Sequence, residues 1–246
     1  MKAIILAGGK GTRLAPYTKI LPKPLIPIGD MPILEILIHQ LKKAGIDEII
    51  LTVGHLAELL RAFFNDGSKL GVKISYSYEQ QPLGTAGPIS LIDGLEETFL
   101  VMNGDVLTTL CLNDLISFHK QQNPIATIAM HSREVFIDLG VIQCNGKDRV
   151  VGYIEKPTNK YLVSMGIYVF EPKILSYIPS GKYLDFPDLV NELLIANEKV
   201  MGYSYDGYWQ DLGRPDDYEQ AYSDFETMRS QFLPESECSE LANSIS

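Results

Sequence analysis

Through residue 112, short apolar runs of strand length alternate with stretches in which apolar side chains recur every three or four residues. The second spacing is typical of an amphipathic helix, because it places the apolar side chains on one face. The strand-like runs are 2–7, 48–53, 72–78 and 99–102, and the helix-like stretches are 30–45, 56–64 and 84–95. This alternation predicts a doubly wound, Rossmann-like α/β fold, with three α/β/α layers around a mixed, mostly parallel central sheet.

After residue 112 the strand-like runs follow one another more closely, at 125–130, 141–144, 150–154 and 166–170. Asn145-Gly146, between two of these runs, predicts a tight hairpin turn. We expect a single domain over 1–232, in which the half 113–232 forms a smaller lid over the half 1–112. Residues 233–246 are acidic and rich in serine, so we expect a disordered tail there.

The composition argues against several classes of protein. The chain has 246 residues, a formal net charge of −10 and a hydrophobic fraction of 46%. No apolar run approaches the roughly 18 residues of a membrane span, and the apolar N-terminal run is too short for a signal peptide. Cys111, Cys144 and Cys238 fit neither a disulfide framework nor a zinc site. We therefore expect a cytoplasmic protein without a membrane partner, and the acidic balance argues against a nucleic-acid polymer as partner.

A glycine-rich turn follows the first strand-like run and reads Gly8-Gly9-Lys10-Gly11-Thr12-Arg13. Glycines allow backbone N–H groups to converge on a phosphate, because no Cβ atoms obstruct the approach. Cationic side chains gather in the same segment, ahead of the first acidic residue, Asp30; they are Lys2, Lys10, Arg13, Lys19 and Lys23. In an acidic chain, such a segment predicts a binding site for a polyphosphate.

Two familiar phosphate-binding motifs do not fit this turn. A dinucleotide fingerprint requires a third glycine where Leu14 stands, and a P-loop requires Lys-Ser or Lys-Thr where Thr12-Arg13 follows Gly11. A dinucleotide-dependent oxidoreductase remains an alternative, because Asp30 lies about 20 residues beyond Gly11. The prolines that precede Asp30 argue against the continuous helix that such an enzyme needs in this place.

Residues 6–14, Pro16 and Pro22-Lys23-Pro24-Leu25 together resemble the opening of the sugar-1-phosphate nucleotidylyltransferases, also called nucleotide-sugar pyrophosphorylases. The resemblance continues in blocks to about Tyr218, and the run 82–87 is similar to mannose-1-phosphate guanylyltransferases. It implies transfer of a nucleotidyl group from a nucleoside triphosphate to a sugar 1-phosphate, which yields a nucleotide-sugar and pyrophosphate. It also implies a homo-oligomer, a nucleotide-binding half over 1–112 and a sugar-binding half over 113–232.

The resemblance assigns roles to individual residues. In this family's pattern Arg13 would neutralise the leaving pyrophosphate, and Lys23 would contact the reacting phosphates. Asp105 ends the strand-like run 99–102, Asp211 ends an aromatic run, and the two aspartates match the family's Mg²⁺ ligands. The nucleotide would contact Leu6, Ala7, Gly8, Gly9, Gly11, Thr12, Arg13, Glu79, Gly84 and Thr85. The sugar phosphate would contact Gly140, Glu155, Lys156, Ser164 and Gly166.

Two of these positions bear on the substrates. Glu79 is a carboxylate, which only accepts hydrogen bonds, and guanine presents two adjacent donors; this favours GTP and a mannose-1-phosphate guanylyltransferase-like reaction. Ser164 stands near a position where many relatives have asparagine, so the sugar stays open. The alternatives are the same reaction with UTP, dTTP or CTP and glucose 1-phosphate or another sugar 1-phosphate, and a non-catalytic regulatory protein that binds a nucleotide-sugar.

Overall fold

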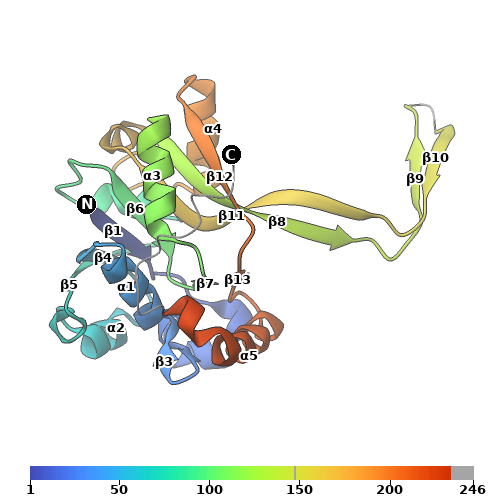
Figure 1. Ribbon diagram of the computed structural model, residues 1–246. Helices are drawn as coiled ribbons and strands as arrows, with labels where there is room; N and C mark the ends of the chain where they lie inside the picture. Colours follow the sequence, from blue (N-terminus) through green and yellow to red (C-terminus); the bar gives the residue numbers. More distant parts are fainter. Residues whose placement is uncertain (147, 234–246) are drawn as a thin grey trace.

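The computed structural model describes residues 1–146 and 148–233. Its centre is a seven-stranded sheet in the order β12-β8-β11-β6-β1-β4-β5 (Figure 1). The strands are β1 Lys2–Leu6, β4 Glu48–Val53, β5 Lys73–Tyr78, β6 Phe99–Asn103, β8 Ala126–Phe136, β11 Thr158–Phe170 and β12 Val200–Tyr205. Only β11 pairs antiparallel with its neighbours within this sheet. The predicted mixed, mostly parallel sheet is therefore confirmed.

Helices cover both faces of the sheet and complete the three layers (Figure 1). One face carries α1 Ile33–Lys43, α2 Ala57–Phe64 and α3 Leu112–Gln122. The other carries α4 Phe186–Ile195 with two 3₁₀ helices, η5 Gly87–Leu91 and η6 Pro172–Tyr177. In α1, Leu34, Leu37, Ile38 and Leu41 are fully buried against the sheet, as their helical spacing predicts.

Short ribbons and a long helix lie beyond the carboxyl ends of the central strands. β7 Val106–Thr108 pairs with β13 Trp209–Asp211, and β2 Pro27–Ile28 pairs with β3 Met31–Pro32. Helix α5, Pro215–Phe232, packs on these ribbons through Phe225 and Phe232, which are fully buried. The remaining 3₁₀ helices are η1 Thr12–Leu14, η2 Tyr17–Lys19, η3 Lys23–Leu25 and η4 Ser68–Leu70.

The second half of the chain extends the same sheet through β8, β11 and β12, and so it does not form a separate lid layer. Beyond the body, β8 and β11 continue together as a two-stranded ribbon that projects away from the sheet and ends in the hairpin β9 Val141–Cys144 and β10 Val150–Ile154 (Figure 1). We call residues 132–163, without residue 147, the arm. The predicted hairpin at Asn145-Gly146 forms its tip, whereas β8 and β11 are longer than predicted.

The helix predicted over 84–95 is wrong, because the structure has only the short η5 there. The amide groups of Ala86 and Gly87 both donate to the carbonyl oxygen of Leu184, at 2.9 and 3.0 Å. The amide of Leu184 donates to the carbonyl of Leu83 at 2.9 Å. A segment almost 100 residues away thus binds the backbone groups that a helix would have used.

No helix within the described residues is long and apolar enough to span a membrane. The tail predicted from residue 233 onward lies outside the described residues except for Leu233.

His119 of α3 is buried, at 1% exposure, and its two ring nitrogens lie 2.8 Å from the Thr127 hydroxyl and 3.0 Å from a Glu171 carboxylate oxygen. Burial lowers the pKa of His119 below its usual value of 6.5, although Glu171 opposes the shift. The folded protein therefore keeps the ring neutral at pH values where the unfolded chain protonates it.

Proton uptake on unfolding makes the free energy of unfolding depend on pH. The contribution of His119 to the free energy of unfolding should be fully present above about pH 6.5. It should decline as the pH falls from there towards the lowered pKa of the folded state. The slope should be at most about 1.4 kcal/mol per pH unit. Urea unfolding at several pH values between 5 and 7.5 measures this slope. His119→Gln should flatten it, and His39→Gln is the control; an unchanged slope in His119→Gln would contradict the assignment.

Candidate active site

The glycine-rich turn leaves β1 at the carboxyl ends of three adjacent parallel strands. Leu6 is in register with Thr52 of β4 on one side and Asn103 of β6 on the other. The amide of Ala7 donates to the carbonyl of Thr52 at 2.9 Å, and the amide of Gly104 donates to the carbonyl of Leu6 at 3.0 Å. Ligands of open α/β sheets bind at this edge, so the turn lies where a ligand is expected.

Gly11 fixes the shape of the turn. Its φ is +58°, and a Cβ atom there would lie 2.8 Å from the methyl carbon of Thr18. The buried Thr18 hydroxyl also donates a hydrogen bond to the carbonyl of Gly11 at 2.8 Å. Glycine is therefore required on two grounds, backbone conformation and space. Sequence reasoning missed Thr18, because a threonine in a short 3₁₀ helix such as η2 carries no recognisable pattern.

Three charged side chains from distant parts of the sequence meet beside the turn. The Lys23 ammonium forms an ion pair with Oδ2 of Asp105 and lies 3.9 Å from Oδ1 of Asp211. The side chain of Lys23 is only 10% exposed. The structure thus brings together the three residues that the sequence proposes for phosphate and metal binding.

Main-chain hydrogen bonds hold the two aspartates at a set spacing. Asp211 is in register with Val106, the residue after Asp105, in the β7–β13 ribbon. The amide of Leu212 donates to the carbonyl of Asp105 at 3.0 Å. Each carboxylate is therefore carried by a hydrogen-bonded strand end, which positions a ligand group more rigidly than a free loop does.

Asp211 lies in surroundings that oppose the ionisation of its carboxyl group. Burial raises the pKa of Asp211, and the negative charge of Asp105 raises it further, while Lys23 and Arg13 act in the opposite direction. Two carboxylates that reach one ammonium also suit a divalent ion. Among the described residues, no group of three or more His, Cys, Asp or Glu side chains forms a complete metal site. The pair fits Mg²⁺ bound to a nucleotide, which takes one or two carboxylates and completes its shell with phosphate oxygens and water.

Two neighbouring pockets flank these charges, and Arg13 lines both. The first has a volume of about 240 Å³ and is lined by Leu6, Ala7, Gly9, Gly11, Thr12, Arg13, Lys23, Pro24, Gly104 and Asp105. The second has about 320 Å³ and is lined by Arg13, His131, Ser132, Arg133, Glu134, Trp209, Gln210, Asp211, Arg214 and Asp217. Six nucleotide-site residues predicted from the sequence line the first pocket. Sequence reasoning missed Arg214, which adds a third arginine beside Arg13 and Arg133.

Glu79 lies against the glycine-rich turn. Its Oε2 accepts a hydrogen bond from the amide of Leu83 at 3.1 Å, and its Oε1 occupies the space that a Cβ atom on Gly8 would need. Burial raises the pKa of Glu79, and the hydrogen bond from Leu83 opposes the shift. The carboxylate that the sequence proposes for reading the base therefore contacts the turn that would hold the phosphates.

Gly84 and Thr85 have structural partners of their own. A Cβ atom on Gly84, which has a φ of +81°, would lie 2.8 Å from Oδ1 of Asp185. The amide and hydroxyl of Thr85 both donate to Oδ1 of Asp185, at 2.9 and 3.1 Å, and the Thr85 hydroxyl accepts from the amide of Phe186. Thr85 thus ties the segment after Glu79 to the start of α4, and its proposed contact with nucleotide stays a prediction.

The proposed sugar-phosphate residues divide into two groups. Ser164 and Gly166 lie at the base of the arm, where Gly166 packs against the side chain of Asn103, two residues before Asp105. Gly140, Glu155 and Lys156 lie beyond the far end of the β8–β11 ladder, next to the ends of the β9–β10 hairpin. There Lys156 forms an exposed ion pair with Asp138 at 2.7 Å. The structure does not bring this second group to the pockets of the same chain.

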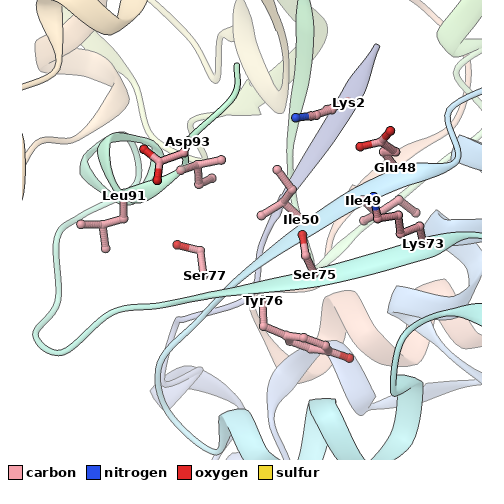
Figure 2. A pocket seen from close by; sticks show the side chains of 11 residues that line it. Lys2, Glu48, Ile49, Ile50, Lys73, Ser75, Tyr76, Ser77, Leu91 and Asp93 are labelled. Carbon is pink, nitrogen blue, oxygen red and sulfur yellow. The ribbon is translucent and has the colours of Figure 1, made fainter. Parts of the chain in front are cut away.

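Another pocket of about 320 Å³ lies on the sheet surface towards the opposite end of the strands (Figure 2). Its walls include Lys2, Glu48 and Lys73, which are the first residues of β1, β4 and β5. Leu91 and Asp93 face them across the pocket (Figure 2). Because it lies towards the amino ends of the strands, this pocket is separate from the candidate active site.

Comparisons with known proteins agree with this geometry. UTP–glucose-1-phosphate uridylyltransferase of Synechocystis sp. is 36% identical over 241 residues, which cover 90% of this chain and 62% of that protein. Mannose-1-phosphate guanylyltransferase of Mycobacterium tuberculosis is 36% identical over 230 residues, which cover 90% of this chain and 64% of that protein. The chain therefore spans less than two thirds of the length of these relatives.

Solved structures extend the agreement to the fold. HddC from Yersinia pseudotuberculosis, solved in complex with GMP-PN, is 25% identical with a TM-score of 0.69, and the match covers 91% of this chain and 99% of that chain. A Bacillus anthracis protein in complex with a sucrose is 26% identical with a TM-score of 0.74, over 91% and 94% of the two chains. The nucleotidyl transferase family model matches residues 2–228. The resemblance read from the motifs is thus confirmed, and the chain belongs to the nucleotidyl transferase family.

Proposed function

We propose that the protein transfers a nucleotidyl group from a nucleoside triphosphate to a sugar 1-phosphate, with release of pyrophosphate. A phosphate oxygen of the sugar 1-phosphate attacks the α-phosphorus, and the bond from the α-phosphorus to the oxygen that bridges it to the β-phosphate breaks. The convergence of Lys23, Asp105 and Asp211 beside the glycine-rich turn is the observation that carries this proposal. The family and the named activities of the relatives support it.

The attacking phosphate is already an anion, so the reaction needs no general base on the protein. The two substrates are polyanions that repel each other. The side chains would overcome this repulsion by positioning the substrates and neutralising their charge. Lys23 is buried beside the turn and would contact the reacting phosphates, while Arg13 lines both pockets and would neutralise the pyrophosphate that leaves. Glycines 8, 9 and 11 would let backbone amides approach the nucleotide.

Asp105 and Asp211 would hold Mg²⁺ when a nucleotide is bound. The ion would neutralise phosphate oxygens in the transition state. The chain's own contribution is the spacing of the two carboxylates, which the β7–β13 ribbon maintains.

Guanine is the base that Glu79 would favour. Its Oε1 lies beside Gly8, and as an ionised carboxylate it can accept both hydrogen bonds that guanine offers side by side. We therefore propose GTP as the nucleotide and mannose 1-phosphate as the first sugar phosphate to test. UTP, dTTP or CTP with glucose 1-phosphate or another sugar 1-phosphate is the alternative, because the named activities of the relatives include uridylyl as well as guanylyl transfer.

Glu79→Gln should shift the preference from GTP towards UTP. The amide keeps the shape of the carboxylate, but it replaces one acceptor by a donor and removes the charge, so that guanine loses a charge-assisted hydrogen bond worth about 1.5–3 kcal/mol. The ratio of kcat/KM for GTP to that for UTP should fall by roughly 10- to 100-fold. Glu58→Gln, on the exposed side of α2, is the matched control, and an unchanged ratio in Glu79→Gln would remove the base-reading role.

A matrix of four nucleoside triphosphates against several sugar 1-phosphates, scored by pyrophosphate release, tests the proposed function directly. The expected result is Mg²⁺-dependent turnover with at least one pair, and the highest rate with GTP. Nucleotide-sugar binding without turnover for any pair would favour the alternative of a non-catalytic regulatory protein. Reduction of a nicotinamide cofactor, followed by fluorescence, would favour the oxidoreductase.

A further inference from the structure

The arm carries a high concentration of exposed apolar surface. Ten of the twenty large apolar side chains that are exposed in the described part of the chain belong to it. They are Val135, Phe136, Leu139, Ile142, Val150, Val151, Tyr153, Ile154, Tyr161 and Leu162. Single exposed apolar side chains are ordinary on soluble proteins, but a concentration of them on one projecting element indicates a surface that binds something.

Within the part of the chain that the structure describes, neither face of the arm has a covering layer. Successive residues of a strand point to opposite faces, yet Val135 and Phe136 are 42% and 60% exposed, and Tyr161 and Leu162 are 53% and 63% exposed. A two-stranded ribbon without a covering layer is at best marginally stable in water. The arm therefore needs a surface to pack against, and residues 1–146 and 148–233 of its own chain do not provide one (Figure 1).

Hydrogen bonds at the base set the direction of the arm. The register of β11 against β8 shifts between Ser164 and Tyr168, which marks a bulge. The Ser164 hydroxyl accepts from the amide of Gly166 at 3.2 Å and lies 2.9 Å from the Tyr168 hydroxyl. The Trp209 indole N–H donates to the carbonyl of Met165 at 3.0 Å. These contacts attach the base of the arm to the body of the protein.

The residues proposed for the sugar phosphate are therefore separated from the nucleotide pocket of their own chain. The continuous β8–β11 ladder runs from Ser164 to Thr158, and Lys156 lies beyond its end. Six residue steps of about 3.3 Å place Thr158, the end of the ladder, roughly 20 Å along the ribbon from Ser164, and Lys156 lies two residues further on. No lysine side chain spans that distance, so Glu155 and Lys156 do not reach the pockets beside Asp211 in their own chain.

We propose that two copies of this chain exchange arms, so that Glu155 and Lys156 of each copy complete the pocket around Lys23 and Asp211 of the other. The assignment of Glu155 and Lys156 rests on the proposed function. The exchange follows a two-fold axis, because each copy gives and receives the same element. It covers the apolar faces of both arms and joins the separated halves of the site in one arrangement.

Mixed dimers test the exchange. Lys23→Ala removes the pocket's cation and leaves the arm intact, whereas Lys156→Ala removes the cation of the arm and leaves the pocket intact. Each variant alone should show strongly reduced turnover. After co-expression with two different tags and purification of the mixed dimer, one of its two sites should contain both lysines, and the turnover should return to about half that of a wild-type dimer. Background turnover in a mixed dimer would overturn the proposal, because it would place both lysines of a site on one chain.

The mass of the protein in solution gives a second test that does not depend on turnover. The wild-type chain should have the mass of a dimer or a multiple of it in light scattering coupled to gel filtration. Phe136→Ser with Leu162→Ser, both at exposed positions, should raise the dissociation constant of the dimer at least tenfold. Ile195→Ser, which is 81% exposed on α4 and outside the arm, is the matched control.

The outcomes separate the two proposals. A dimer that depends on the arm but shows no turnover with any substrate pair would contradict the proposed function and leave the exchange standing. A wild-type protein with the mass of a monomer would overturn the exchange. The exchange would also be overturned if the double arm variant and Ile195→Ser both stayed dimeric. A variant that does not fold, as judged by circular dichroism, is replaced by Val151→Ser, since Val151 is 62% exposed near the tip.

Discussion

Lys23→Ala should reduce turnover by roughly 10²–10³-fold, the typical cost of removing one preorganised group that stabilises charge in the transition state. The Lys23 side chain is 10% exposed and lies beside the glycine-rich turn. A cation in such a sheltered place acts more strongly on a developing charge than the same cation in water. Pyrophosphate release at saturating substrate concentrations measures the effect.

A matched control is available in the same segment. Lys19 is exposed in η2 and does not line either pocket, so Lys19→Ala should keep turnover within about twofold. Thermal unfolding of Lys23→Ala separates a catalytic effect from a structural one, because removal of the ammonium leaves Asp105 and Asp211 without their shared partner. Near-normal turnover in a folded Lys23→Ala protein would refute the role of this lysine.

Asp105→Asn should raise the Mg²⁺ concentration needed for half-maximal turnover by at least roughly 10- to 100-fold, which is the cost of losing even an outer partner of a metal ligand. The substitution keeps the shape of the side chain and removes its negative charge. Asp211 would then be the only carboxylate of the pair left to bind the ion. Burial already raises the pKa of its carboxyl group. Titration of the rate with Mg²⁺ at fixed nucleotide concentration measures the change.

Asp217→Asn provides the control for charge alone. Asp217 also lines the pocket beside Asp211, and its carboxylate accepts a hydrogen bond from Gln210 at 2.8 Å. If Asp105 is a ligand, Asp217→Asn should change the Mg²⁺ requirement much less than Asp105→Asn. Equal shifts in both variants would mean that the general negative potential, rather than coordination, attracts the ion.

The parallel half of the sheet was predictable because β1, β4 and β6 are largely buried apolar runs bounded by turns, while the edge strand β5 alternates apolar and polar residues. The apolar runs predicted at 48–53 and 72–78 agree with β4 and β5 to within a residue. The α1 helix was equally clear, since its buried residues recur at helical spacing. In these elements the local sequence pattern and the tertiary environment favour the same secondary structure. Such agreement allows the structure to be predicted from the sequence.

The arm was not predictable from local pattern. β8 continues through Ser132, Arg133 and Glu134, which are polar and exposed, so that the alternation of buried and exposed residues that marks a strand is missing. Cross-strand pairing with Thr158–Leu162 holds these residues extended instead. The separation of Lys156 from Lys23 followed from the same feature, because the motif identified both lysines without indicating where the chain between them leads.

The candidate site shows the same division. The motifs proposed Lys23, Asp105 and Asp211, because the sequence blocks that contain them resemble the family's pattern. Thr85 was identified with them, but its hydrogen bonds to Asp185 depend on a contact across 100 residues of sequence. Side-chain partners of this kind depend on the folded arrangement and leave no local signal.

The pairing of Asp211 with Val106, together with the hydrogen bond from Leu212 to Asp105, means that the distance between the two acids is inherited from the peptide backbone. If the proposed function holds, substitutions in the surrounding walls would alter which sugar or base is accommodated without disturbing the spacing of the two carboxylates. Substrate selectivity and metal binding would then be able to change independently in this fold. A change of substrate would not require a change in the spacing of the two carboxylates.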